Sequence, residues 1–176
     1  DEILSGNFII EKRSMLNANV SQGKSIIVET TALNDIFLSK GATGRMIECE
    51  TTIGGQSVAC TRSDGIIVAT PTGSTAYALS VGGPILHPLL PAIVFAPICP
   101  QSLGQRPLVL DDQSIIEIRI VELAGADANF FVDGLHSLAL KGDETIRIQR
   151  SQNITRLVRS KSHNHYATLS TKLGWG

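Results

Sequence analysis

Short runs of β-branched and apolar residues recur along the whole chain, separated by turns rich in glycine and polar residues. In the clearest run, residues 114–122, isoleucine at three alternate positions is interleaved with charged residues and a valine. Such alternation is typical of a strand with one buried face. Similar runs cover residues 7–20, 25–30, 45–52, 57–62, 66–68, 92–96, 129–133, 145–150 and 154–159. Short strands at this spacing predict an antiparallel β-sandwich rather than a parallel α/β sheet.

One or two short helices are expected to complete this mainly β fold. The first lies in the stretch from Asp64 to Pro88, which is predicted to run as strand, turn and helix. Thr72 and Ser74 follow a proline and are suited to cap a helix over residues 75–80. The second candidate is residues 165–173, followed by Gly174 as a left-handed stop.

The turn after Pro71 is a candidate binding surface. The first N–H groups of a helix have no intrahelical acceptor, and here they would lie beside the hydroxyls of Thr72, Ser74 and Thr75. We expect such donors to suit an anion or a phosphate-bearing ligand. The stretch has neither the lysine of a Walker loop nor the G-x-G-x-x-G spacing of a dinucleotide fingerprint. The alternative is a well-capped structural turn.

A polar pair, Asn34 and Asp35, interrupts the otherwise apolar string TALNDIFL. Polar groups in such a setting must be satisfied by hydrogen bonds or by a ligand. They therefore mark either a ligand contact or an Asx turn or helix cap, and the pattern leaves both open.

Composition limits the class of partner. The 176 residues carry a formal net charge of -1 and are 18% charged, which argues against a nucleic-acid partner. No run of about 18 apolar residues is present, so we expect no membrane contact and a cytoplasmic location. The chain starts with Asp rather than Met, so we expect the native N-terminus to be absent.

Cysteine and histidine give no clear site. Cys49, Cys60 and Cys99 form no C-x-x-C pair and are expected to be small buried thiols in a reducing compartment. His163 and His165 are close enough to form a metal pair, but no third ligand is near in the sequence, which favours a solvated loop.

The nineteen residues TPTGSTAYALSVGGPILHP, at positions 70–88, resemble the signature of the NAD kinases. Further matches are Asn34-Asp35, Arg106-Pro107-Leu108, Asp133-Gly134 and the ending TLSTKLGW. The resemblance covers essentially the whole chain. It implies phosphorylation of the 2'-hydroxyl of the adenosine ribose of NAD to give NADP, with ATP or polyphosphate as phosphoryl donor and Mg²⁺ as the expected divalent ion.

In NAD kinases an N-terminal α/β domain carries a Gly-Gly-Asp-Gly motif, and NAD binds between it and a C-terminal β-sandwich. No Gly-Gly-Asp-Gly occurs in this chain. The resemblance therefore implies that residues 1–176 form a single NAD-binding and oligomerisation domain. The catalytic aspartate would lie outside the chain, no catalytic or metal-binding residue is assigned within it, and the chain alone is expected to be inactive.

The resemblance also implies NAD contacts. Asn34 and Asp35 would bind polar groups of NAD, and the other contacts would be Thr75 and Ala76 at the adenosine half, Tyr77 and Ser80 in the same pocket, and Arg45, Arg62 and Asp64 with a looser match. Residues of the Asp64 and Tyr77 type reach a neighbouring subunit's site in the family, which implies a homo-oligomer, a dimer or a tetramer. Leu135 departs from the family's glutamine and cannot make that residue's hydrogen bonds.

Two other functions compete with this one. A non-catalytic β-sandwich that binds a nucleotide or assembles subunits is compatible with the absence of Gly-Gly-Asp-Gly. A related lipid kinase shares the two-domain plan, but residues 70–88 together with Asn34-Asp35 match the NAD enzymes. The sequence leaves open ATP against polyphosphate, NAD against NADH, feedback regulation and the subunit count.

Overall fold

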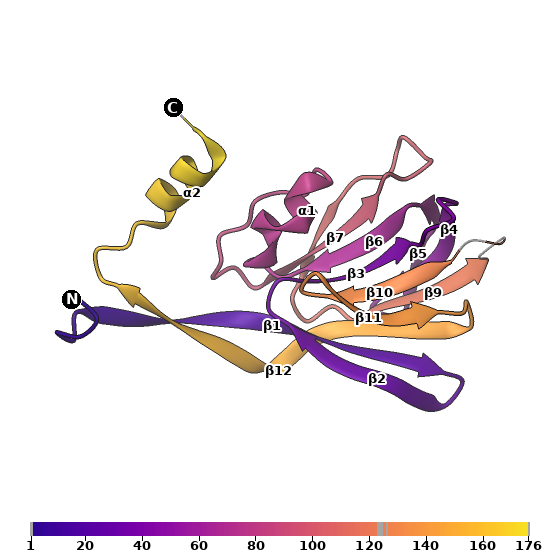
Figure 1. The fold of residues 1–176 in the computed structure, drawn as a ribbon, viewed down its shortest axis with the longest axis horizontal. Helices are drawn as coiled ribbons and strands as arrows, with labels where there is room; N and C mark the ends of the chain where they lie inside the picture. The colour runs from indigo at the N-terminus through magenta and orange to yellow at the C-terminus, as the bar shows by residue number, and fades with distance from the viewer. Residues whose placement is uncertain (1, 123–124, 126, 176) are drawn as a thin grey trace. The chain divides into compact units, whose positions relative to one another are not determined.

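The computed structural model describes residues 2–122, 125 and 127–175. The chain divides into two compact units, one of residues 13–154 and one of residues 1–12 with 155–176. The larger unit contains most of the strands, and these lie in two antiparallel sheets (Figure 1).

Both sheets have six strands. The first has the order β2-β1-β12-β9-β4-β5 and consists of β1 (Phe8–Gln22), β2 (Ser25–Ala32), β4 (Ile47–Ile53), β5 (Gln56–Ser63), β9 (Ile116–Glu122) and β12 (Glu144–Ser160). The second has the order β11-β10-β3-β6-β7-β8 and consists of β3 (Asp35–Lys40), β6 (Gly65–Ala69), β7 (Ala92–Ile98), β8 (Leu108–Asp111), β10 (Ala128–Val132) and β11 (Leu135–Leu140). The predicted antiparallel β-sandwich is confirmed.

The main core consists of alternate residues from both sheets. Ile116 and Ile118 of β9 are fully buried in it, as the alternation of residues 114–122 predicts. From the second sheet, Ile36 and Leu38 of β3 and Phe130 of β10 enter the same cluster. Because side chains alternate along a strand, the odd-numbered residues of β3 face the opposite side of that sheet. Asp35 and Phe37 therefore lie on its outer face.

Part of this outer face is covered by residues 71–91. This segment contains a 3-10 turn, η1 (Gly73–Thr75), and a short helix, α1 (Tyr77–Ser80), which lies over β6 and β7 in Figure 1. Ala78 of α1 packs with Ile67 of β6 and Val94 of β7 in a second hydrophobic cluster. As a result, β6 is buried at all five of its positions. The predicted order of strand, turn and helix is confirmed.

Three strands were not predicted, namely β3, β8 and β11. Asp35 begins a strand, so the alternative of an Asx turn or helix cap at residues 34 and 35 does not describe this segment. The strand predicted at residues 92–96 is longer than expected, because β7 continues to Ile98 and Pro97 is in register with Ile66 of β6.

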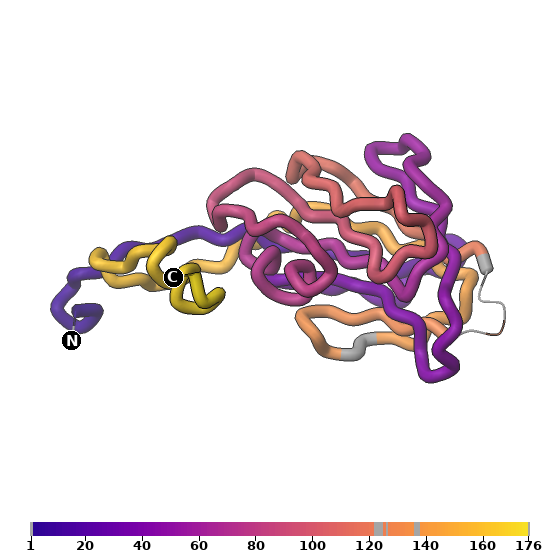
Figure 2. The backbone as a smooth tube through the Cα atoms, turned by 90° about the horizontal axis from the view of Figure 1, so that it is seen from above, coloured from indigo at the N-terminus to yellow at the C-terminus, as the bar shows by residue number. Residues whose placement is uncertain are grey.

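The smaller unit contains the first part of β1, the last part of β12 and the helix α2 (His165–Leu173), and both termini of the chain belong to it (Figure 2). Asn164 caps α2, because its side chain accepts hydrogen bonds from the backbone N–H groups of residues 166 and 167. Gly174 ends the helix with a φ of 67°. The prediction of a helix over residues 165–173 is confirmed.

The cysteine prediction is only partly right. Cys49 is buried in the main core, but Cys60 and Cys99 are exposed. Cys60 belongs to β5, an edge strand, where it faces outward, and Cys99 follows the end of β7 with a positive φ of 44°. Neither α1 nor α2, among the described residues, has the length and hydropathy of a membrane-spanning helix.

Candidate functional site

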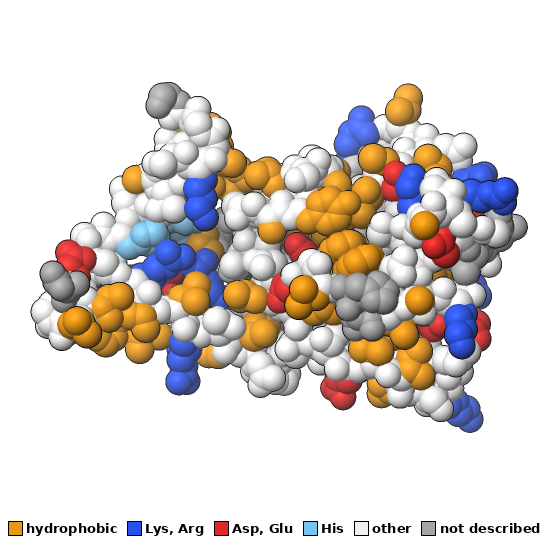
Figure 3. All heavy atoms as spheres, viewed as in Figure 1, with side chains coloured by type: hydrophobic (Ala, Val, Ile, Leu, Met, Phe, Trp, Pro, Cys, Tyr) orange, Lys and Arg blue, Asp and Glu red, His pale blue; other side chains and the backbone are white. Residues whose placement is uncertain are grey.

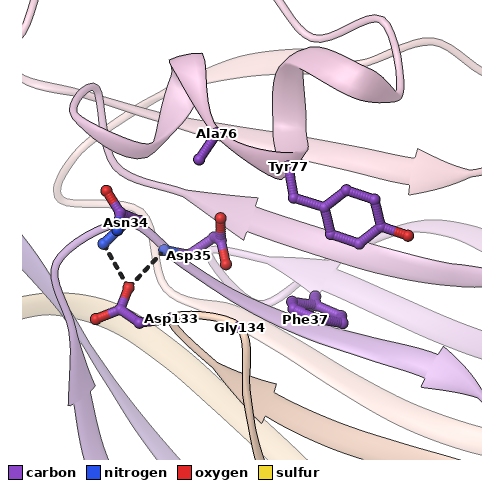
Figure 4. A pocket seen from close by; sticks show the side chains of 7 residues that line it. All are labelled: Asn34, Asp35, Phe37, Ala76, Tyr77, Asp133 and Gly134. Carbon is purple, nitrogen blue, oxygen red and sulfur yellow. Dashed lines mark hydrogen bonds between the residues drawn. The ribbon is translucent and has the colours of Figure 1, made fainter.

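A pocket of about 280 Å³ opens on the outer face of the second sheet, within the larger unit. It joins the start of β3, the start of α1 and the turn between β10 and β11 (Figure 4). Its lining residues are Asn34, Asp35, Phe37, Ala76, Tyr77, Asp133 and Gly134. In the face shown in Figure 3, acidic and hydrophobic side chains lie side by side below α1. The pocket thus combines a polar wall with an apolar one.

The polar wall is held by the turn at Asp133 and Gly134. Val132 pairs with Leu135, so these two residues form a two-residue hairpin loop, and both have a positive φ, 48° and 77°. Asp-Gly is a preferred pair for such a turn. The Asp133 carboxylate accepts hydrogen bonds from the backbone N–H groups of residues 33, 34 and 35, at 2.9, 2.6 and 3.2 Å. Its own N–H donates to the carbonyl of Asp35 at 2.9 Å.

Residues 70–73 hold the Asn34 backbone from the other side. The N–H of Thr70 donates to the Asn34 carbonyl at 2.8 Å, and the Thr70 hydroxyl donates to the Leu33 carbonyl at 2.6 Å. The same hydroxyl accepts the N–H of Gly73 at 3.0 Å. A Cβ on Gly73 would lie 2.0 Å from the Asn34 carbonyl oxygen, so only glycine permits this close approach. The Asn34 backbone is therefore fixed on two sides.

The hydroxyls after Pro71 do not act as predicted. Thr72 makes no side-chain capping hydrogen bond. The Ser74 hydroxyl is buried, donates to the Pro71 carbonyl at 2.7 Å and accepts the N–H of Leu86 at 3.0 Å. The Thr75 hydroxyl donates to the Thr72 carbonyl at 3.3 Å. The prediction that Thr72 and Ser74 cap the helix is wrong, and the alternative of a structural turn describes these contacts.

Asp35 is the titratable group most affected by the pocket. Its side chain is buried, and the carboxylate points toward the segment of Ala76 and Tyr77 (Figure 4). The pKa of Asp35 is raised from 3.8 to about 6, because burial and, to a smaller extent, the charge of Asp133 raise it more than a hydrogen bond from the Tyr77 backbone lowers it. Asp35 therefore changes its charge close to neutral pH.

Aromatic rings form the apolar wall. The Phe37 ring lies edge-on to Tyr77, with centroids 5.1 Å apart, and stacks on Phe131 at 4.6 Å with an interplanar angle of 7°. Burial raises the pKa of the Tyr77 phenol, and nearby Cys99, Asp64 and Asp35 raise it further. Tyr77 is 38% exposed, so part of its side chain is accessible. This wall suits the flat face of a heterocycle.

Four of the nine residues implied by the resemblance line this pocket: Asn34, Asp35, Ala76 and Tyr77. Thr75 is exposed immediately before them. Ser80 lines a different cavity of about 430 Å³, together with Cys99, Gln105 and Arg106.

The other three are not among the lining residues of this pocket. Asp64 forms an ion pair with Lys40 at 2.7 Å, beyond the far end of β3. Arg45 lies near Gly125, and Arg62 is exposed on β5. Their roles, like those of the other assigned residues, stay predictions.

The prediction from the sequence did not include Phe37, Gly73 and the carboxylate of Asp133 as parts of the site. For Asp133 a signal existed, because Asp-Gly after an apolar run predicts a tight hairpin turn. For Gly73 and Phe37 the sequence contains no comparable signal, because their roles depend on contacts with residues distant in the chain.

Comparison with known proteins identifies the family. The family model described as ATP-NAD kinase C-terminal domain matches residues 33–160, a range that contains every residue lining the pocket. The chain belongs to this family. A C-terminal domain of an ATP-NAD kinase is also consistent with the two sheets and two short helices described above.

Several NAD kinases are similar to this ATP-NAD kinase C-terminal domain. The NAD kinase of Thiobacillus denitrificans is 42% identical over 176 residues, which is 100% of this chain and 60% of that protein. The NAD kinase of Pseudomonas aeruginosa (strain UCBPP-PA14) is 43% identical over 175 residues, 99% of this chain and 59% of that protein. The chain thus spans about 60% of the length of the relatives it matches.

Two solved structures show the same fold. Yeast NADH kinase, complexed with NADH, superposes with a TM-score of 0.91 at 33% identity. The match covers 99% of this chain and 51% of the yeast chain. An NAD kinase from Archaeoglobus fulgidus, in complex with ATP, gives a TM-score of 0.76 at 26% identity. The match covers 98% of this chain and 63% of that chain. The fold predicted from the resemblance is therefore confirmed.

Proposed function

We propose that this chain is the NAD-binding part of an NAD kinase, which phosphorylates the 2'-hydroxyl of the adenosine ribose of NAD and yields NADP. The phosphoryl donor would be ATP or polyphosphate. The observation that carries the proposal is the pocket, in which Asn34, Asp35, Ala76 and Tyr77 meet. The complexes of yeast NADH kinase with NADH and of the Archaeoglobus enzyme with ATP support both the acceptor class and ATP as donor.

Residues in and next to the pocket supply distinct contacts. The Asn34 amide offers both donors and an acceptor to polar groups of NAD, and the Asp35 carboxylate, when ionised, accepts hydrogen bonds from ribose hydroxyls. Thr75 and Ala76 offer a hydroxyl and backbone groups to the adenosine half. The partly exposed Tyr77 offers its ring for stacking on a flat part of the ligand.

Positioning of the acceptor is the contribution of this chain to catalysis. Phosphoryl transfer needs little covalent chemistry from the protein and depends on orientation and on charge neutralisation. Fixing the ribose hydroxyl against the donor lowers the entropic part of the barrier. The general base is expected to come from the family's Gly-Gly-Asp-Gly motif, which residues 1–176 do not contain.

A divalent ion, expected to be Mg²⁺, would neutralise the donor phosphates. Among the described residues, no three His, Cys, Asp or Glu side chains are grouped so that they could hold an ion. The donor set of the described residues therefore does not fit a resident metal. The phosphates of the donor are themselves suitable ligands for Mg²⁺.

The remaining assignments belong to the same proposal. Arg45, Arg62, Asp64 and Ser80 are proposed as further NAD contacts, and Asp64 and Tyr77 as residues that reach the site of a neighbouring subunit. This implies a homo-oligomer, a dimer or a tetramer. A cytoplasmic location is proposed on the same basis.

Substitution of Asn34 tests the proposal. In the native-length protein, Asn34→Ala is expected to raise the KM for NAD by about tenfold or more, or to abolish NADP formation from NAD and Mg-ATP. Asn153→Ala, at an exposed position of β12, is the matched control and should leave both parameters unchanged. NAD binding without turnover, with several donors tried, would instead support a non-catalytic binding module.

A further inference from the structure

We propose that Asp133 is a positioning residue for the NAD site, because its carboxylate holds the backbone of residues 33–35 so that Asn34 and Asp35 face the pocket. The inference rests on the proposed function for its ligand. Its geometry does not depend on the ligand. Three successive peptide N–H groups converge on one side chain, at 2.9, 2.6 and 3.2 Å. Figure 4 shows those of Asn34 and Asp35.

The turn alone does not require a carboxylate at this position. A two-residue hairpin loop with two positive φ angles accepts Asn or Gly at its first residue as well as Asp. Asn would keep the turn but would provide one acceptor oxygen instead of two. In the structure both oxygens are used, Oδ2 by Leu33 and Oδ1 by Asn34 and Asp35. The carboxylate therefore serves the neighbouring segment and not the turn itself.

The held segment connects β2 with β3. Leu33 and Asn34 lie between the two strands, so their backbone groups are not part of the regular hydrogen bonding of a sheet. Asp133 takes the N–H groups of this segment, while Thr70 donates to both of its carbonyls, at 2.8 and 2.6 Å. Without Asp133, three N–H groups would need other partners, and the peptide planes that orient Asn34 would be free to rotate.

Asp133 also places a negative charge next to Asp35. Its charge raises the proton affinity of Asp35. The other groups that act on Asp35 are the Tyr77 backbone N–H, which opposes this effect, and the Tyr77 phenol, beside which Asp64 also lies. Removal of the Asp133 charge should therefore shift the titration of Asp35 to lower pH.

Two variants separate the role of the Asp133 carboxylate, as acceptor for the N–H groups of residues 33–35, from its role in the turn. Asp133→Asn and Asp133→Gly both tolerate a positive φ, so the hairpin is retained, but Asn loses one acceptor and the charge, and Gly loses every acceptor. The control is Asp111→Asn, which replaces an exposed aspartate at the end of β8; among the described residues, its Oδ1 accepts the N–H of Gln113.

The first measurement is amide hydrogen exchange of residues 33–35 in the native-length protein. We expect protection to fall at least about tenfold in Asp133→Gly, less in Asp133→Asn, and not at all in Asp111→Asn. Unchanged protection in Asp133→Gly would overturn the proposal, whatever the protein binds.

The second measurement is NADP formation as a function of pH. For Asp133→Gly we expect a KM for NAD at least about tenfold higher, and for Asp133→Asn an acid limb of kcat/KM displaced to lower pH. A purely structural turn would change the unfolding midpoint without moving that limb.

Wild-type turnover with unchanged kinetics in both variants would overturn the positioning role while leaving the proposed function intact. A wild type that neither binds nor phosphorylates NAD would overturn the proposed function, and with it the role of Asp133 toward NAD.

Discussion

The carboxylate of Asp133 accepts a 2.6 Å hydrogen bond from the backbone N–H of Asn34, although 99 positions separate the two residues. The contact exists because β10 and β3 are antiparallel neighbours in the second sheet, with Val132 opposite Ile36. This register brings the β10–β11 turn to the start of β3. The site is therefore built at the ends of strands, where polar backbone groups would otherwise lack partners.

Replacement of Gly73 by alanine should disrupt the site through the backbone. The new Cβ would lie 2.0 Å from the Asn34 carbonyl oxygen, so either η1 or the Asn34 segment must move. We expect Gly73→Ala to lower the free energy of unfolding by about 1–3 kcal/mol and to weaken NAD binding. Gly104→Ala is the control, because its Cβ would meet only the Ser102 hydroxyl at 3.9 Å. Urea unfolding and NAD titration measure both effects, and equal behaviour of the two variants would contradict the account.

Asp35 should make the stability of the protein depend on pH. Its pKa is raised from 3.8 to about 6 in the folded state, so the folded protein holds the proton more tightly than the unfolded chain. This group therefore costs stability progressively as the pH rises from about 4 to about 6, up to about 3 kcal/mol in total. Asp35→Asn removes that loss.

The measurement for Asp35 is urea unfolding of wild type and Asp35→Asn at pH 4 and pH 8. The variant should gain stability relative to wild type at pH 8 and much less at pH 4. A difference between the two proteins that is the same at both pH values would show that Asp35 titrates normally.

The apolar wall depends on Phe37, which packs between Tyr77 and Phe131. Phe37→Ala should reduce the free energy of unfolding by about 2 kcal/mol, less than for a fully buried phenylalanine because the side chain is only half-buried. It should also raise the KM for NAD, because Tyr77 loses its edge contact. Phe37→Leu keeps most of the side-chain volume but not the ring. Compared with Phe37→Ala, it should return the free energy of unfolding closer to the wild-type value than it returns the KM for NAD. Recovery of both to the same extent would mean that the aromatic contacts contribute nothing specific.

A second carboxylate, Asp127, holds the loop of residues 41–44. It accepts hydrogen bonds from the N–H of Ala42 at 2.9 Å and from the hydroxyl of Thr43 at 2.7 Å. The hydrogen bonds with Thr43 lower the pKa of Asp127. A lowered folded-state pKa gives stability that is present above about pH 4 and is lost as the pH falls further. Asp127→Asn should flatten this acid loss in unfolding curves between pH 2 and pH 5, and an unchanged acid loss would rule out this contribution.

The sequence predicted the sandwich where alternation was strong and local. Ile116 and Ile118 of β9 are buried as expected, and α2 ends at Gly174 as expected. It did not predict β3, because Asn34 and Asp35 interrupt an apolar string in a way that is also typical of a turn. It missed β11, since residues 135–140 do not alternate clearly between apolar and polar.

The candidate site was predictable only in part. Asn34, Asp35, Ala76 and Tyr77 follow from the family resemblance, and the structure brings them into one pocket. The hydrogen bonds of the Asp133 carboxylate with residues 33–35 and the close approach of Gly73 to Asn34 join residues far apart in the chain. They therefore depend on strand register, which residue patterns alone do not determine. The capping role expected of Ser74 failed because its hydroxyl donates to a local carbonyl instead.

The most direct test of the central claim is NADP formation from NAD and Mg-ATP by the native-length protein, with Asn34→Ala and Asn153→Ala assayed beside it. We predict turnover by the wild type and by Asn153→Ala, and a KM for NAD raised about tenfold or more, or no turnover, in Asn34→Ala. Equal kinetics in all three proteins would remove Asn34, and with it the pocket at the start of β3, from the NAD site.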